Sequence, residues 1–97
     1  MNIQHVPGAE KLIKAVLSLE NEQECASFFE DICTIKELQD ITQRLEVALM
    51  LHEGKNYQTI SELTGASTAT ISRVKKCLVY GNGGYRAAIE RVKGEEQ

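Results

Sequence analysis

The sequence has few aromatic residues and lacks the segments that mark membrane-spanning and secreted proteins. Its 97 residues include no tryptophan, one proline, two phenylalanines and three tyrosines, so any core must be built mainly from aliphatic side chains. No run of about 18 apolar residues is present, which argues against a membrane-spanning helix. The first residues also lack the basic stretch and apolar block of a secretory signal. We therefore expect a cytoplasmic protein with no membrane contact.

The cysteines and histidines are too few and too scattered to indicate a metal or redox site. Cys25, Cys33 and Cys77 form no Cys-x-x-Cys pair, and His5 and His52 lie far from any cysteine in the sequence. Free thiols in a reducing compartment are the simplest interpretation. The sequence also shows no nucleophile–base pair and no phosphate-binding loop. We expect neither an enzyme nor a bound cofactor or metal.

The chain is short for a protein that folds alone. With 42% hydrophobic and 26% charged residues it has the composition of a globular domain, and we expect one domain over residues 1–97. A domain of this size buries only a modest fraction of its surface. The apolar side chains to be covered include Phe28, Phe29, Leu38, Leu45 and Leu49. We therefore expect an obligate homodimer.

Charge is distributed unevenly along the chain. The net charge is −3, but residues 1–53 hold four basic and ten acidic side chains, whereas residues 54–97 hold seven basic and four acidic ones. Within 55–93 only Glu62 and Glu90 oppose those seven basic groups. A basic half on an acidic protein indicates an oriented contact with a polyanion such as DNA. Chance clustering on solvated helix faces is the alternative.

The first half of the chain has the pattern of three helices. The first is expected to follow Pro7, and the second to follow Asn21, which suits an N-cap. Thr34 with Glu37 forms a capping box for a third helix of about 18 residues, which should end at Gly54. No segment alternates convincingly as a strand does.

Residues 56–79 have the pattern of a helix-turn-helix. Asn56 caps a short helix over Tyr57–Leu63, and Gly65 permits the positive φ of a sharp turn. Ser67 then caps a second helix. The expected seam between the two helices consists of Ile60, Ala66, Ile71 and Val74, with the small Ser61 allowing a close crossing. A helical hairpin with no role in nucleic-acid binding is the alternative.

The opposite face of the second helix has the chemistry of a recognition helix. It carries Thr68, Ala69, Ser72, Arg73 and Lys76. Hydroxyls and methyls suit base edges in the major groove, and long cations suit phosphates. We predict that the bases are contacted by Ser67, Thr68, Ala69 and Ser72. We predict that the phosphates are contacted by Lys55, Lys75 and Lys76, with Gln58 as a weaker contact and Arg73 able to serve either role.

From the first helix to Arg91 the chain resembles the Trp repressor family, in particular the branch often called YerC/YecD-type. The resemblance rests on Leu38–Gly54, which is similar to the long third helix, and on the recognition-helix run Thr70-Ile71-Ser72-Arg73. It implies an all-α fold of six short-to-medium helices per chain in an intertwined homodimer. Residues 8–53 would supply the dimerisation helices and residues 84–93 a C-terminal helix. The two reading heads would face a two-fold symmetric operator.

Some members of the family bind tryptophan before they bind DNA. Thr34, Arg44 and Arg73 match positions of that ligand site, and two cations facing a carboxylate are reasonable chemistry. Val74 stands where tryptophan-binding members have Gly, and Cys77 stands where they have Ser. The branched Val74 should fill the slot for the indole ring. We therefore predict a regulator that either needs no ligand or uses an unidentified small-molecule corepressor.

Three alternatives remain at this point. Arg44 could pair with Asp40 or Glu46 rather than with a ligand. The same dimeric fold could serve as a protein–protein adaptor, which would show no salt-dependent affinity for DNA. It could also serve as an amino-acid sensor whose DNA binding is secondary.

Overall fold

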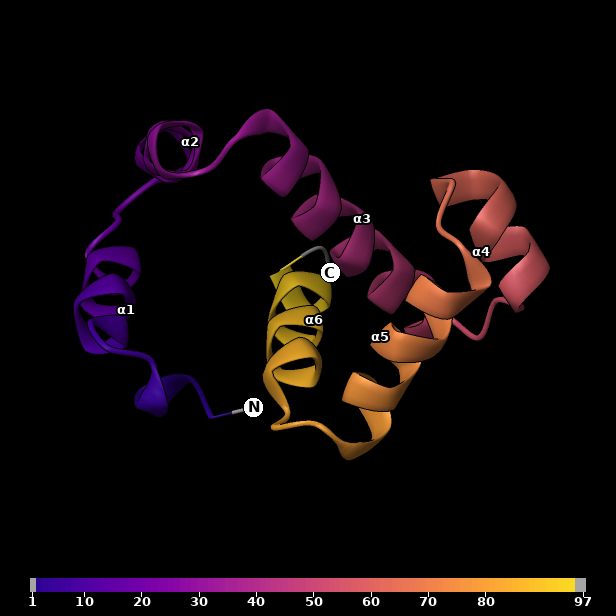
Figure 1. Ribbon diagram of the computed structural model, residues 1–97. Helices are drawn as coiled ribbons and strands as arrows, with labels where there is room; N and C mark the ends of the chain where they lie inside the picture. Colours follow the sequence, from indigo (N-terminus) through magenta and orange to yellow (C-terminus); the bar gives the residue numbers. More distant parts are fainter. Residues whose placement is uncertain (1, 96–97) are drawn as a thin grey trace. The chain divides into compact units, whose positions relative to one another are not determined.

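The structure is a computed structural model that describes residues 2–95, and all regular structure in this range is helical (Figure 1). The elements are the short 3-10 helix η1 (Ile3–His5) and the α-helices α1 (Ala9–Leu17), α2 (Glu22–Ile32), α3 (Ile35–His52), α4 (Tyr57–Thr64), α5 (Thr68–Tyr80) and α6 (Gly84–Glu95). The predicted all-α fold with six α-helices is confirmed. No helix within 2–95 is long and apolar enough to cross a membrane.

Local capping explains where α2 and α3 begin. The side chain of Asn21 accepts a hydrogen bond from the backbone N–H of Glu24 at 2.9 Å, as predicted. Before α3, Thr34 Oγ1 accepts from the Glu37 N–H at 3.1 Å, and Glu37 Oε1 accepts from the Thr34 N–H at 2.8 Å. These are the two reciprocal bonds of a capping box. The backbone bond from Thr34, followed by the hydroxyl bond, holds the pKa of Glu37 below its ordinary value.

The chain divides into two compact units, the first extending to Leu38 and the second beginning at Gln39. In the described part of the first unit, Ala9 is the one buried side chain. The apolar stripe of α1 is exposed, with Leu12, Ile13, Val16 and Leu17 at 38–78% of their full accessibility. Phe28 and Phe29 are half-buried and pack edge to face, with ring centroids 5.6 Å apart. The first unit therefore has almost no core of its own.

The second unit has a continuous aliphatic core. Its buried members are Val47, Ala48, Ile60, Ala66, Ile71, Val74 and Ile89. The predicted seam residues all belong to this cluster, so the packing of α4 against α5 is confirmed. On α3 the buried face is the one with Val47 and Ala48, whereas Leu45, one of the apolar side chains expected to be covered, is 43% exposed. Part of the apolar surface of α3 is therefore accessible within one chain.

Candidate nucleic-acid interface

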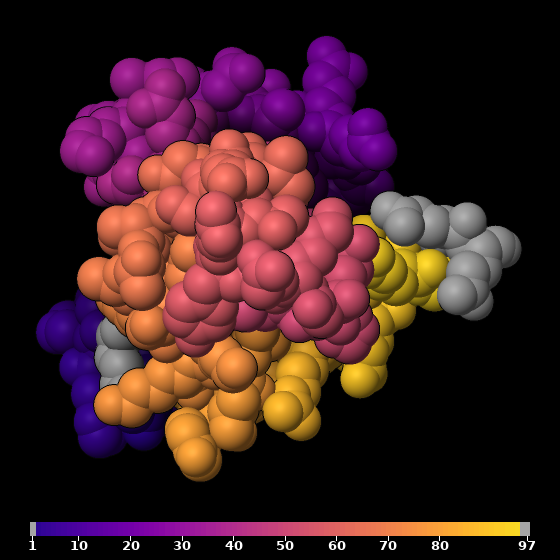
Figure 2. All heavy atoms as spheres, turned by 90° about the vertical axis from the view of Figure 1, so that its right-hand side faces the viewer, coloured from indigo at the N-terminus to yellow at the C-terminus, as the bar shows by residue number. Residues whose placement is uncertain are grey.

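The α4–α5 pair is a helix-turn-helix whose turn is built on a glycine. Gly65 has φ +76°, and its N–H donates to the Ser61 carbonyl at 2.8 Å. Any side chain at this φ would be strained. α4 ends at Thr64, one residue beyond the predicted end. Figure 2 looks onto this unit, with the salmon atoms of α4 lying against the orange atoms of α5.

Side-chain hydrogen bonds fix the turn further. The Ser61 hydroxyl donates to the Ala66 carbonyl at 2.8 Å, so Ser61 ties α4 to the start of the turn in addition to being small. Thr64 Oγ1 accepts from the Ala66 N–H at 3.1 Å. From α3, Gln43 Nε2 donates to the Thr64 carbonyl at 3.1 Å. The sequence alone does not indicate Gln43, because a single glutamine 21 residues before its partner carries no local signal.

The start of α5 is held by Ser67. Its hydroxyl oxygen accepts from the Thr70 N–H at 3.1 Å, and its hydroxyl proton is directed to Thr70 Oγ1 at 3.1 Å. The predicted cap is therefore confirmed. The hydroxyl is already engaged within the helix, so a base contact by Ser67, which stays a prediction, would have to use its remaining acceptor site.

The two sides of α5 are clearly separated. Ile71 and Val74 are at most 1% exposed and point into the core. Since successive residues are rotated by about 100° around a helix, the opposite side carries Ala69, Ser72, Arg73 and Lys76, all of them exposed. α5 contains no acidic residue. Four of the predicted contact residues thus share one exposed face.

Lys75 lies on a different side of α5 from Lys76. Its ammonium nitrogen is 5.7 Å from the centre of the Tyr57 ring, on the N-terminal turn of α4. This is a cation–π distance. The direction of Lys75 is therefore set by Tyr57, on the flank of the exposed face, while Lys76 lies within that face.

The exposed side of α4 carries an acid close to two predicted contacts. Gln58 Nε2 donates to Glu62 Oε1 at 3.3 Å. A shallow depression of about 410 Å³ is lined by Gln58, Glu62 and Thr68, together with Tyr57 and Ser61. The structure thus brings Gln58 and Thr68 together, and it places the carboxylate of Glu62 beside them.

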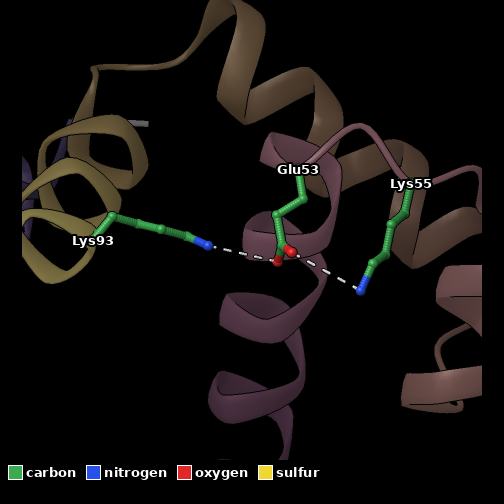
Figure 3. Close-up of polar contacts among 3 residues, drawn as sticks. All are labelled: Glu53, Lys55 and Lys93. Carbon is green, nitrogen blue, oxygen red and sulfur yellow. Dashed lines mark ion pairs between the residues drawn. The ribbon is translucent and has the colours of Figure 1, made fainter. Parts of the chain in front are cut away.

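Lys55, just before α4, belongs to a small surface ion network (Figure 3). Its ammonium lies 4.0 Å from Glu53 Oε2, and the ammonium of Lys93 from α6 lies 3.8 Å from Glu53 Oε1. The three side chains are 37–40% exposed, so the pairs contribute little to stability. The network leaves Lys55 at the surface near the first turn of α4.

The residues predicted for a ligand site are distributed over both units. Thr34 belongs to the first unit, where its hydroxyl caps α3, and Arg44 and Arg73 belong to the second. Arg44 is half-buried on α3, whereas Arg73 is exposed on α5. The three-residue ligand set stays a prediction.

Two positions that depart from the tryptophan-binding pattern have different environments. Val74 is 1% exposed and belongs to the core of the second unit, whereas Cys77 is exposed.

Cys25 and Cys33 are half-buried free thiols. No group of three potential metal ligands occurs within the described range.

Known proteins resemble this chain over nearly its whole length. The family model described as Trp repressor protein matches residues 8–93. The chain is 54% identical over 98 residues to the uncharacterized protein YerC of Bacillus subtilis strain 168, and the match covers 99% of this chain and 94% of that protein.

Two crystal structures are also similar. One is a candidate Trp repressor from Staphylococcus aureus, with a TM-score of 0.88, 47% identity and coverage of 96% of this chain and 95% of that one. The other is a TrpR-like protein from Eubacterium eligens ATCC 27750, with a TM-score of 0.86, 50% identity and 92% coverage of both chains. The similarity extends over sequence and fold together.

Proposed function

Because this chain belongs to the Trp repressor family, we propose that it is a transcriptional repressor that binds one double-stranded operator sequence as a homodimer. Family membership indicates a DNA-binding transcription regulator rather than an enzyme. The repressor role, the dimer and the independence from tryptophan are the finer parts of this proposal. A protein that acts on the bacterial chromosome would work in the cytoplasm.

The observation that carries the proposal is the exposed face of α5. Ala69, Ser72, Arg73 and Lys76 present a methyl, a hydroxyl and two cations to solvent, with no acidic residue on the helix. The helix is held by its buried side and by the turn at Gly65. A major groove accepts a helix with these groups on one side, because they match base edges and phosphates.

We assign the contacts as follows. Thr68, Ala69 and Ser72 face bases, with Ser67 at the helix start, and Arg73 contacts either DNA or a ligand. Lys55 and Lys76 contact phosphates, and Gln58 contributes a neutral hydrogen bond. The sequence places Lys75 among the phosphate contacts, but its position over Tyr57 favours a role on the flank.

The exposed apolar surface supports the homodimer. Soluble monomers seldom expose large contiguous apolar patches. This chain leaves Leu17 78% exposed and Ile35 73% exposed, and the first unit has almost no core. We propose that the helices of 8–53 cover these side chains against a second copy. Residues 1–97 would then form one domain within the dimer, with the helix-turn-helix at 56–79 and the C-terminal helix at 84–93.

Sedimentation tests the homodimer. At low micromolar concentration we expect one species of twice the chain mass. Leu17→Lys should weaken that dimer, because Leu17 is 78% exposed within one chain and would be covered by a second copy. A well-folded monomer of the wild type would contradict the dimer.

The surroundings of Val74 support independence from tryptophan. Its branched side chain is packed in the core where tryptophan-binding members have Gly. We propose that the protein binds its operator without tryptophan. Any corepressor that uses Thr34, Arg44 and Arg73 would be a different small molecule.

Selection from a random duplex library tests the repressor function. The purified protein should retain fragments that share one two-fold symmetric sequence, with half-sites about one helical turn apart. Expression of the genes beside that sequence should rise when the protein is removed. Retention of no common sequence, together with no affinity for DNA at low salt, would contradict the proposal and favour a protein–protein adaptor.

A further inference from the structure

A groove in the second unit lies on the flank of α5 that carries Lys75. Its volume is about 580 Å³, which falls within the range of small-molecule sites. The end of α3, the start of α4, and α5 and α6 all contribute to it. Its lining includes none of Thr34, Arg44, Arg73, Val74 or Cys77. It is therefore separate from the positions that match the family's tryptophan site.

The apolar floor of the groove is formed by Leu51, Tyr57 and Leu78. All three residues are half-buried and pack against the buried core. Each comes from a different helix, so the surface they form depends on the folded unit. Such a surface offers an apolar molecule one face of contact with little rearrangement.

The rim of the groove carries three cations and one acid. Lys75 is held over the Tyr57 ring, and Lys55 stands at the end near α4. Arg86 Nε donates to the Leu78 carbonyl at 2.9 Å, which directs its guanidinium across the end of α5. Arg86 is otherwise exposed, so its terminal nitrogens are accessible to a bound anion. Glu90 is the one carboxylate in the lining.

We propose that this groove binds a small organic anion, a phosphate- or carboxylate-bearing molecule with an apolar body. The apolar body would lie on Leu51, Tyr57 and Leu78, and the anionic group would be bound by Lys75 and Arg86. Planar guanidinium groups suit phosphate and carboxylate alike. A DNA phosphate would use the cations but would leave the apolar floor unused, which favours a small molecule.

Binding in the groove would connect the recognition helix to α6. Lys75 and Leu78 belong to α5, and Arg86 belongs to α6. A molecule that contacts all three would fix the angle between these helices and would thereby change DNA affinity. This regulatory consequence rests on the proposed DNA binding, whereas binding of the anion to the free protein does not.

The test uses phenyl phosphate and phenylacetate as probes with the full chain and no DNA. Amide chemical shifts measured by NMR should change for residues 51–57, 75–79 and 86–90, and should saturate with probe concentration. Lys75→Gln and Arg86→Gln should each raise the Kd about fivefold or more. Arg91→Gln is the matched control, since it removes the same charge from an exposed site on α6 outside the groove.

One variant should improve binding, which a folding defect cannot imitate. Glu90→Gln removes the carboxylate of the groove and should lower the Kd about two- to fivefold. Arg86→Lys should bind more tightly than Arg86→Gln, although it lacks the Nε bond to Leu78. Comparing the two probes shows which anionic group is preferred.

Several results would overturn the inference. Inorganic phosphate binding as tightly as phenyl phosphate would mean that the floor contributes nothing, and the groove would then be a contact for DNA phosphates. Equal Kd values for the wild type, Arg86→Gln and Glu90→Gln would also exclude it. Shift changes confined to residues 67–73 would place the anion on the DNA-binding face. A protein that binds the probes but not DNA would keep this inference and contradict the proposed function.

Discussion

Lys75 lies over the ring of Tyr57, with 5.7 Å between its ammonium nitrogen and the ring centre, and this contact separates it from its neighbour Lys76. The two lysines are adjacent in sequence but point about 100° apart around α5. Lys76 shares an exposed face with Ser72, whereas Lys75 lines the groove beside α6. Two identical side chains therefore have different expected partners.

The first prediction distinguishes these lysines by salt dependence. Removing one phosphate contact should reduce the slope of log affinity against log salt by about 0.9. Lys76→Ala should weaken selected and random DNA alike and reduce the slope by about one contact. Lys75→Ala should leave the slope nearly unchanged. Fluorescence anisotropy at several salt concentrations measures both, and equal changes for the two variants would return Lys75 to the phosphate set.

The second prediction concerns base reading. Thr68→Val removes a hydroxyl from the start of α5, and Ser72→Ala removes one from its exposed face. Each should cost the selected site about 1–3 kcal/mol while random DNA binds almost as before. Thr42→Ala, at an exposed position on α3, is a suitable control and should change neither affinity. Equal losses on both duplexes would remove Thr68 and Ser72 from the reading face.

The third prediction concerns the acid on α4. Glu62 lies beside Gln58 and Thr68, so its carboxylate should repel a nearby DNA backbone. Glu62→Gln should tighten binding to all duplexes by up to about 1 kcal/mol at low salt, and less at high salt. Glu10→Gln, far from α4 in the sequence and exposed on α1, is the matched change of charge. No gain over Glu10→Gln would mean that this side of α4 does not approach DNA.

The fourth prediction concerns tryptophan. If Val74 fills the slot, then saturating tryptophan should change neither the Tm nor the affinity for DNA. A bound ligand at a hundredfold excess over its Kd would stabilise the protein by about 2.7 kcal/mol. Thermal unfolding with and without tryptophan checks this directly. A rise in Tm that follows mass action would contradict the role given to Val74.

The fifth prediction concerns acid stability at the start of α3. The pKa of Glu37 is lowered in the folded protein by its bonds to Thr34, so ionised Glu37 stabilises the fold. This contribution is complete above the ordinary carboxyl pKa and is lost as the pH falls through the lowered value. Glu37→Gln should remove that part of the acid dependence. Unfolding free energies of both proteins from about pH 7 to about pH 3 measure it, and parallel curves would contradict the assignment.

Local patterns predict the helix ends well, because each depends on residues close together in sequence. Local patterns predict the capping box of Thr34 and Glu37, the turn at Gly65 and the seam around Ile71. They do not predict long-range contacts. Gln43 reaches the turn from 21 residues away, and the direction of Lys75 depends on a ring from another helix. The sequence cannot identify either partner, Thr64 for Gln43 or Tyr57 for Lys75, until the packing of the helices is known.

The proposed function depends most on the exposed face of α5 reading a DNA sequence. The most direct measurement is the affinity of the wild-type protein for the selected duplex and for a scrambled duplex of the same composition, at physiological salt and without added ligand. We predict that the selected duplex binds at least about a thousandfold more tightly. Equal affinity for the two duplexes would contradict a sequence-reading role for this face.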